Sequence, residues 1–193
     1  MYKGNNRKAI QSQRWLSQAL CDLMQDCTYE KITIGDICLR ADLSRQTFYN
    51  LFGSKNEILH FSLRDAYEEQ FYLLARQETL TADDIVESFA HVVDSRRKLL
   101  NAMTENHLSS ILAEEIQRCV GLFAGRFVPA DEKDASFPYI EALTAGAVSG
   151  LLTYWLQQSE PISREELSGI LSEFLEGSFF STAKAVSAAA DIK

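Results

Sequence analysis

The sequence predicts an all-α protein, with a three-helix helix-turn-helix domain at the N-terminus and a second domain of about six helices. Apolar residues recur every three, four or seven positions through most of the chain, which is the spacing of one face of a helix. The three prolines, Pro129, Pro138 and Pro161, all lie in the last third, so the rest of the chain lacks the main helix breaker. No stretch alternates apolar and polar residues for long enough to predict a strand.

The bulk composition fits a folded protein with a charge difference between its ends. The chain has 193 residues, a formal net charge of -8 and 46% hydrophobic residues, which suits one globular unit or a small module joined to a larger one. Residues 1–56 carry eight basic and five acidic side chains, a net +3, whereas residues 57–193 carry eleven basic and 22 acidic ones, a net −11. This favours an N-terminal domain, 1–56, that contacts a polyanion. So small an excess also arises by chance.

The first helix is predicted over residues 6–26, where Leu16, Leu20 and Met24 share one face. A short second helix begins at Thr33, whose hydroxyl can cap it with Asp36 as the reciprocal partner. The first helix supplies an apolar surface against which short helices can pack.

The sequence "ADLS", residues 41–44, predicts the turn between two short helices. Asp42 tolerates left-handed backbone, and Ser44 can cap a third helix that ends near Leu51 with Gly53 as its C-terminal cap. Ser54 and Glu57 have capping-box spacing and begin a fourth helix.

The second domain, residues 57–193, is predicted to be helical throughout. Its predicted helices cover residues 54–77, 83–94, 95–105, 107–126, 137–158 and 163–185. The charged segment 127–136 is predicted to be a loop. The last helix begins with a capping box formed by Ser163 and Glu166.

Two short helices joined by a tight turn predict a DNA-binding helix-turn-helix, in which the second helix enters the major groove. Arg45, Gln46 and Thr47 would project from its N-terminal half towards base edges, because Arg suits guanine and Gln suits adenine. Surface pairing of Arg45 with Asp36 or Asp42 is the alternative for that side chain.

A separate group of donors is predicted to contact phosphates or adjacent DNA. It contains Thr33, Ser44, Tyr49, Asn50 and Lys55. The helix ends near Thr33 and Ser54 favour anions, and Lys55 adds a full positive charge there. The alternatives are that the hydroxyl residues only cap helices, that Tyr49 is partly buried core, and that Lys55 is a solvated lysine.

The segment "YEKITIGDICLRADLSRQTFYNLFGSKNEIL", residues 29–59, resembles the tetracycline-repressor (TetR) family of bacterial transcription regulators. The patterns "KITI-x-x-I", "A-x-x-S-R-x-T-F-Y-x-x-F" and "K-x-x-I-L" have the family's spacing, and the resemblance covers residues 8–60. It implies that the residues at the family's DNA-contact positions, Thr33, Ser44, Arg45, Gln46, Thr47, Tyr49 and Lys55, have that role here. It also implies that residues 57–193 form a helical effector-binding and dimerisation domain. The family often has Gly where this chain has Asp42.

The last two predicted helices favour a homodimer. Ala142, Gly146 and Gly150 are four residues apart, so they form a smooth ridge that another backbone can approach. The predicted interface consists of Ala142, Gly146, Gly150, Trp155, Leu167, Ile170, Leu171 and Phe174. The alternative is that both faces serve only the internal core. A G-x-x-x-G spacing also occurs in membrane helix pairs, but the polar residues of 142–159 argue against a membrane span.

A pocket for an unknown small-molecule effector is predicted in the second domain. The candidate ligand-binding residues are Phe71, Phe89, His91, Met103, Phe123, Tyr154 and Trp155. For each of them, ordinary core packing or surface exposure is the competing interpretation. The sequence shows no catalytic constellation, so we expect no enzyme activity, no cofactor and no metal site.

Cys21, Cys27, Cys38 and Cys119 form no C-x-x-C pair or zinc pattern, and the N-terminus lacks a signal-peptide core. These features predict a cytoplasmic protein with reduced cysteines.

The sequence thus predicts a dimeric transcriptional regulator, most simply a repressor, that binds a palindromic DNA operator and is released by a small molecule. The alternative is a helix-turn-helix regulator without an effector, which acts through protein–protein contacts of its acidic domain.

Overall fold

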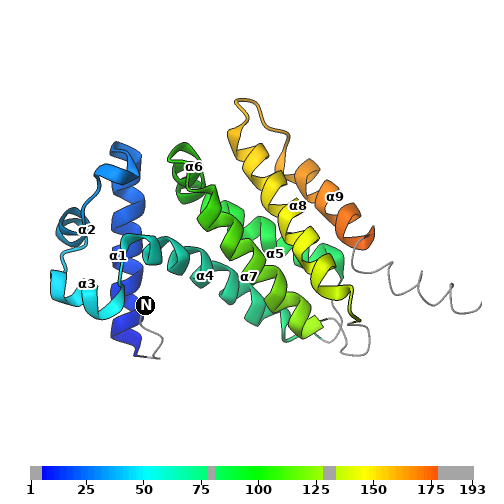
Figure 1. Cartoon of the computed structure of the whole chain (residues 1–193), viewed down its shortest axis with the longest axis horizontal. Helices are drawn as coiled ribbons and strands as arrows, with labels where there is room; N and C mark the ends of the chain where they lie inside the picture. The colour runs from blue at the N-terminus through cyan, green and yellow to red at the C-terminus, as the bar shows by residue number, and fades with distance from the viewer. Residues whose placement is uncertain (1–5, 78–80, 128–133, 178–193) are drawn as a thin grey trace, which may run out of the picture. The chain divides into compact units, whose positions relative to one another are not determined.

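The computed structural model describes residues 6–77, 81–127 and 134–177. Within these ranges the regular structure is α-helical apart from one short 3-10 turn and a π-type turn at residues 176–177, which confirms the all-α prediction (Figure 1). The chain forms two compact units, Met1–Ala66 with Arg96–Leu112 and Tyr67–Ser95 with Ala113–Lys193. The first unit therefore contains a segment from beyond the predicted boundary at residue 56. The division of function between the predicted domains stays a prediction.

The first unit is built around a long helix that contacts several short ones. Its elements are α1 (Arg7–Asp26), the 3-10 turn η1 (Tyr29–Lys31), α2 (Ile34–Arg40), α3 (Arg45–Leu51), the start of α4 (Lys55–Leu74), α6 (Arg97–Glu105) and the start of α7 (Ser109–Phe127). Helix α1 packs against α2, α3 and α6. The two short helices are thus supported by a neighbour of 20 residues, without which seven-residue helices would not persist in water.

The core of this unit follows the predicted apolar faces. Leu16 and Leu20 of α1 are fully buried, as are Ile37 of α2 and Phe48 of α3. Phe52 directly follows α3 and is buried too. Burying an apolar side chain of this size contributes about 1.5–3 kcal/mol, so the orientation of α3 is strongly fixed.

The turn between α2 and α3 has the predicted left-handed residue. Asp42 has φ 53°, and the next N–H, that of Leu43, donates to the Cys38 carbonyl at 3.0 Å. The Asp42 N–H donates to the carbonyl of Leu39 at 3.3 Å, so the helix ends in a Schellman motif. Asp42 therefore takes the backbone conformation that Gly would take there.

Two of the predicted capping boxes are present, Thr33 with Asp36 and Ser163 with Glu166. The start of α4 differs in detail. Its Glu57 carboxylate accepts a hydrogen bond from the Gly53 N–H at 2.9 Å, while the Glu57 N–H donates to the Ser54 hydroxyl at 3.4 Å.

Gly53 lies at the predicted end of α3, one residue after the cap position, but its backbone is not left-handed. No glycine in the described ranges has positive φ, and α3 ends at Phe52 with extended backbone. A Cβ on Gly53 would lie 3.2 Å from the Glu57 carboxylate, so the glycine gives that side chain room.

The second unit contains α5 (Ala82–Ser95), most of α7 (Ser109–Phe127), α8 (Phe137–Gln157) and α9 (Arg164–Leu175). Helix α9 packs against α5. The Arg164 guanidinium bonds Asp94 at 2.9 Å, and the Ser172 hydroxyl bonds Asp83. At the end of α8, the Trp155 indole donates to the Ile162 carbonyl at 2.8 Å, which fixes the connection to α9.

Parts of two predicted segments, residues 163–185 and 127–136, lie outside the described residues. None of the helices in the described ranges has the length and apolar character that crossing a membrane requires.

Candidate nucleic-acid interface

Helix α3 is held at its start by a side-chain cap and from one side by the core. The Ser44 hydroxyl accepts a hydrogen bond from the Thr47 N–H at 3.0 Å and lies 2.9 Å from the Thr47 hydroxyl. Phe48 and Leu51 are buried, and the Phe48 and Phe52 rings are 6.1 Å apart. A helix fixed in this way presents its remaining side chains in a defined arrangement.

The opposite face of α3 carries hydrogen-bonding side chains in solvent. Arg45, Gln46 and Asn50 are exposed, and Tyr49 is 61% exposed. Thr47 is half-buried beside Ser44. The structure thus brings the predicted base-reading residues together on one accessible surface, and the alternative of a partly buried Tyr49 does not apply.

Arg45 lies against α2. Its Nη2 atom would be 2.6 Å from a Cβ placed on Gly35, so the guanidinium extends over that glycine. Among the residues that the structure describes, no carboxylate forms an ion pair with Arg45 within 4.0 Å. Its head group is therefore not neutralised by a direct contact, and reorienting a flexible side chain costs little.

The start of α2 is capped through a charged hydrogen bond. The Asp36 carboxylate accepts from the Thr33 hydroxyl at 2.6 Å and from the Thr33 N–H at 2.9 Å. These bonds, led by the one from the side chain, lower the pKa of Asp36, and the positive charge of Arg45 adds a smaller effect. Thr33 therefore acts as a cap, and its predicted contact with DNA stays a prediction.

Lys55 has partners within the protein. Its ammonium group donates to the carbonyls of Tyr29 at 2.6 Å and Ile32 at 3.0 Å, and lies 3.5 Å from that of Glu30. It also lies 4.1 Å from the centre of the Tyr29 ring, within the range of a cation–π contact. The alternative of an ordinary solvated lysine does not describe this side chain.

The predicted effector-binding residues are dispersed. The Phe71 and Phe123 rings meet edge to face at 5.4 Å and are half-buried, as is Phe89. His91 and Tyr154 are exposed, and Trp155 is buried. Met103 is fully buried, and it belongs to the first unit. The predicted set is thus divided between the two units, and its members differ in exposure.

A buried carboxylate in the second unit was not predicted. Glu115 is 2% exposed; it accepts a hydrogen bond from the Tyr67 hydroxyl at 3.0 Å and lies 3.5 Å from the Arg118 guanidinium. Burial, and then the charge of Glu115, raise the pKa of Cys119 to about 12, so its thiol is protonated and unreactive at neutral pH. The spacing Leu112, Glu115, Ile116, Cys119 was the available signal, since it places Glu115 on an apolar helix face.

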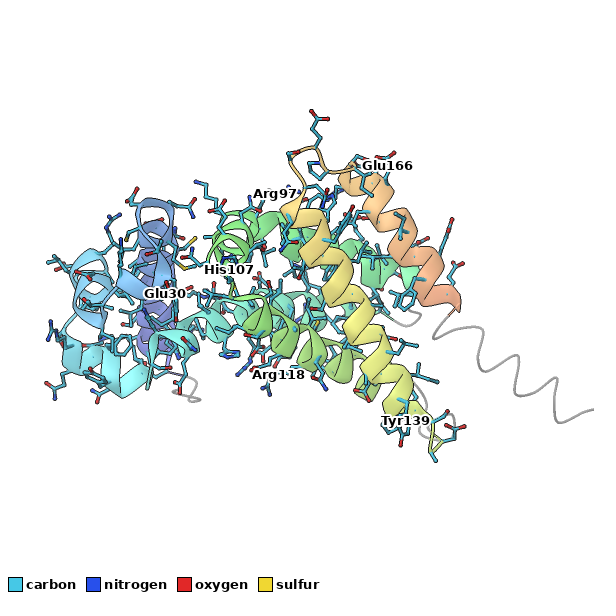
Figure 2. The ribbon with its side chains drawn as sticks, turned by 45° about the horizontal axis from the view of Figure 1, so that its top comes forward. Glu30, Arg97, His107, Arg118, Tyr139 and Glu166 are labelled. Carbon is cyan, nitrogen blue, oxygen red and sulfur yellow. The ribbon has the colours of Figure 1, made fainter. Side chains whose placement is uncertain are left out.

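Helix α8 has an exposed apolar face. Tyr139 is 77% exposed, Leu143 66% and Tyr154 64%, and Figure 2 shows Tyr139 projecting from the first turn. Between them lie Gly146 and Gly150, where an added Cβ would have no atom of the described residues within 4 Å. These five positions, which we call the α8 face, are spaced by three or four residues and so lie on one side of the helix.

The predicted dimer residues divide between this face and the interior. Ala142, Gly146 and Gly150 are exposed on α8, Ile170 is exposed on α9, and Phe174 is half-buried. Trp155, Leu167 and Leu171 are buried within the chain itself. The predicted interface stays a prediction, and only its exposed members could make extensive direct contact with a second copy.

Comparison with known proteins gives a short sequence match and several structural ones. No protein-family model matches the chain. The dhaKLM operon transcriptional activator DhaS of Lactococcus lactis is 37% identical over 65 residues, which are 34% of this chain and 35% of DhaS. The chain thus matches little more than a third of that relative's length.

The structural matches extend over most of the chain. A TetR-family transcriptional regulator from Streptomyces coelicolor superposes with a TM-score of 0.58 and 18% identity, over 92% of this chain and 84% of the regulator. The chain has the fold of the TetR-family transcriptional regulators.

Two further structures share this TetR-type fold. Lin0861 from Listeria innocua has a TM-score of 0.73 and 16% identity, over 91% of this chain and 95% of that protein. The dihydroxyacetone kinase operon activator DhaS has a TM-score of 0.61 and 18% identity, over 86% of this chain and 94% of DhaS. The relatives with functional names are transcriptional regulators and not enzymes.

Proposed function

We propose that this TetR-type chain is a transcriptional regulator that inserts the N-terminal half of α3 into the major groove of an operator. The observation that carries the proposal is the α3 surface, where Arg45, Gln46 and Tyr49 are exposed on a helix whose opposite side is buried. The buried side of α3 fixes the orientation of the helix. The exposed donors can then reach base edges in one defined arrangement.

A homodimer is the second part of the proposal. The α8 face exposes three large apolar side chains beside two open glycines, and a second copy would remove that surface from water. A two-fold dimer would present two α3 helices to a palindromic site about 34–36 Å apart or slightly more. Dimerisation and a palindromic operator therefore belong together.

Release by a small molecule completes the proposal. The half-buried pair Phe71 and Phe123 is a candidate to meet an apolar effector in the second unit. Helix α4 carries residues of both units, so a change at its C-terminal end has a continuous route to its start. The effector would act by favouring a conformation that spaces the two α3 helices poorly.

The test of DNA binding is a selection from random duplexes by the purified protein, followed by titration of the enriched sequence. We expect a palindromic consensus and salt-sensitive binding. Replacing Arg45, Gln46 and Thr47 together by Ala should weaken binding at least ~100-fold, because each good base contact contributes about 1–3 kcal/mol. Unchanged affinity in this variant would refute the assignment of α3.

The sign of regulation has a second candidate, activation, because the matched relative DhaS is a transcriptional activator by name. An activator could act without an effector, through contacts of the acidic second domain with another protein. Deleting the gene and measuring transcripts of the operon beside it separates the two: a rise indicates repression, and a fall indicates activation. A thermal-shift screen with metabolites then tests for an effector.

A further inference from the structure

The segment Tyr29–Ile32, which leads into α2, forms hydrogen bonds with residues of α4 and with the C-terminal end of α6. Several of these bonds involve Tyr29. This residue is buried in η1, and its backbone N–H donates to the Asn106 side-chain oxygen at 2.6 Å. Its hydroxyl donates to the Asn56 side chain of α4 at 2.5 Å. The segment ends at Ile32, directly before the Thr33 cap of α2.

The contact from α6 comes from a rigid helix end. Asn106 is the C-terminal cap of α6, and its side-chain N–H donates to the Ala102 carbonyl at 2.8 Å. His107 has φ 58°, and the Leu108 N–H donates to the Met103 carbonyl at 2.8 Å, which completes a Schellman motif. Asn106 is therefore fixed before it accepts the Tyr29 N–H. Figure 2 labels the neighbours of this bond, Glu30 in the segment and His107 after the cap.

Besides Asn56, α4 contributes the Lys55 ammonium group to this segment. An ammonium group has three N–H donors, and three carbonyls of this segment lie within 3.5 Å of it. These carbonyls belong to Tyr29, Glu30 and Ile32, at or beside the C-terminal end of η1, where a positive charge is favourable. A phosphate contact by Lys55 would have to displace these bonds.

We propose that Lys55 and Asn106 are positioning residues that hold the Tyr29–Ile32 segment, and with it the start of α2, and that Lys55 is not a phosphate ligand. The inference depends on the proposed function for its DNA-binding consequence only. Helix α6, which packs against α1, belongs to the same compact unit as α2 and α3, so the proposed contacts lie within one unit.

The first test is hydrogen exchange of the Tyr29 amide in the free protein. Asn106→Ala removes its acceptor. We expect the amide to exchange about tenfold faster, because the free energy of one such hydrogen bond corresponds to about a tenfold change in the equilibrium between closed and open states. Asn101→Ala is the matched control, because Asn101 is exposed on the same helix. Unchanged exchange in Asn106→Ala, or equally faster exchange in both variants, would refute the proposal that Asn106 holds the Tyr29–Ile32 segment.

The second test is operator affinity as a function of salt for Lys55→Met and Lys55→Arg. A lost phosphate contact lowers the slope of log K against log salt by about 0.9. We expect both variants to bind about tenfold more weakly with the wild-type slope, because the planar guanidinium does not fit the carbonyl set.

The two Lys55 variants distinguish the possible outcomes. Full affinity in Lys55→Arg with a reduced slope in Lys55→Met would establish a phosphate ligand and overturn the inference. If Lys55→Met fails to fold, Lys55→Arg and Asn106→Ala still decide. Absence of DNA binding by the wild type would refute the proposed function and leave the exchange result standing.

Discussion

Helices α3 and α8 both leave a row of side chains in solvent, but the chemistry of the two rows differs. Helix α3 exposes Arg45 and Gln46, which are well hydrated alone, whereas the α8 face exposes Leu143 and two tyrosines. Burying apolar surface yields roughly 25 cal/mol per Å², while polar groups gain mainly by matching specific partners. The α8 face is thus suited to strong, unselective burial and α3 to selective recognition.

The largest expected effect comes from removing a buried side chain that holds α3 against the core. Phe48 is fully buried, so Phe48→Ala should lower the free energy of unfolding by about 3–5 kcal/mol. Tyr49 is its exposed neighbour on the same helix, and Tyr49→Ala should change stability by less than about 1 kcal/mol. Urea denaturation of both variants measures the difference. Similar losses would mean that the two sides of α3 are not distinct.

A charge placed on the α8 face should have the next largest effect. Leu143→Arg leaves the single chain intact because Leu143 is 66% exposed, but it would bury a charge in the proposed dimer. We expect the dimer dissociation constant to rise at least ~100-fold, about 2.7 kcal/mol. Sedimentation equilibrium measures it, with Gln117→Arg, which adds the same charge at an exposed position of α7, as the control. Equal dimerisation by all three proteins would remove the α8 face from the interface.

The smallest expected effect concerns the capping box of Thr33 and Asp36 at the start of α2. The pKa of Asp36 is lowered from its usual 3.8 by hydrogen bonds from Thr33, so its carboxylate stabilises the fold above that value. The stability advantage of wild type over Asp36→Asn should be constant at neutral pH and shrink as pH falls through the lowered pKa. Denaturation against pH measures it, with the exposed Glu105→Gln as the control. An advantage that persists in acid would contradict this account of the cap.

The local features of the fold could be predicted from the sequence. Helix positions, the cap at Ser44 and the left-handed backbone at Asp42 all depend on residues within a few positions of each other. The buried face of α3 was also predictable, since Phe48 and Leu51 follow helical spacing. The place of Gly53 at the end of α3 was predictable too, but not that it makes room for the Glu57 carboxylate.

Contacts between distant segments could not be predicted in the same way. The hydrogen bond from Tyr29 to Asn106 joins residues 77 positions apart, and no local pattern encodes it. Lys55 was assigned to phosphates because it adds a positive charge at a helix start, and nothing in that local position predicts its bonds to the carbonyls of η1. Leu167 and Leu171 had the apolar spacing of either a core or an interface, and only the packing of α9 on α5 distinguishes them within one chain.

The empty space above Gly146 and Gly150 has a consequence for how substitutions there would be selected. Alanine in place of a mid-helix glycine favours the helix by about 1 kcal/mol, and its methyl group would meet none of the residues that the structure describes. In the proposed dimer, the same methyl groups would hold two backbones apart. A screen for soluble, heat-resistant protein would therefore enrich alanine at these positions, while a screen for gene control in cells would reject it.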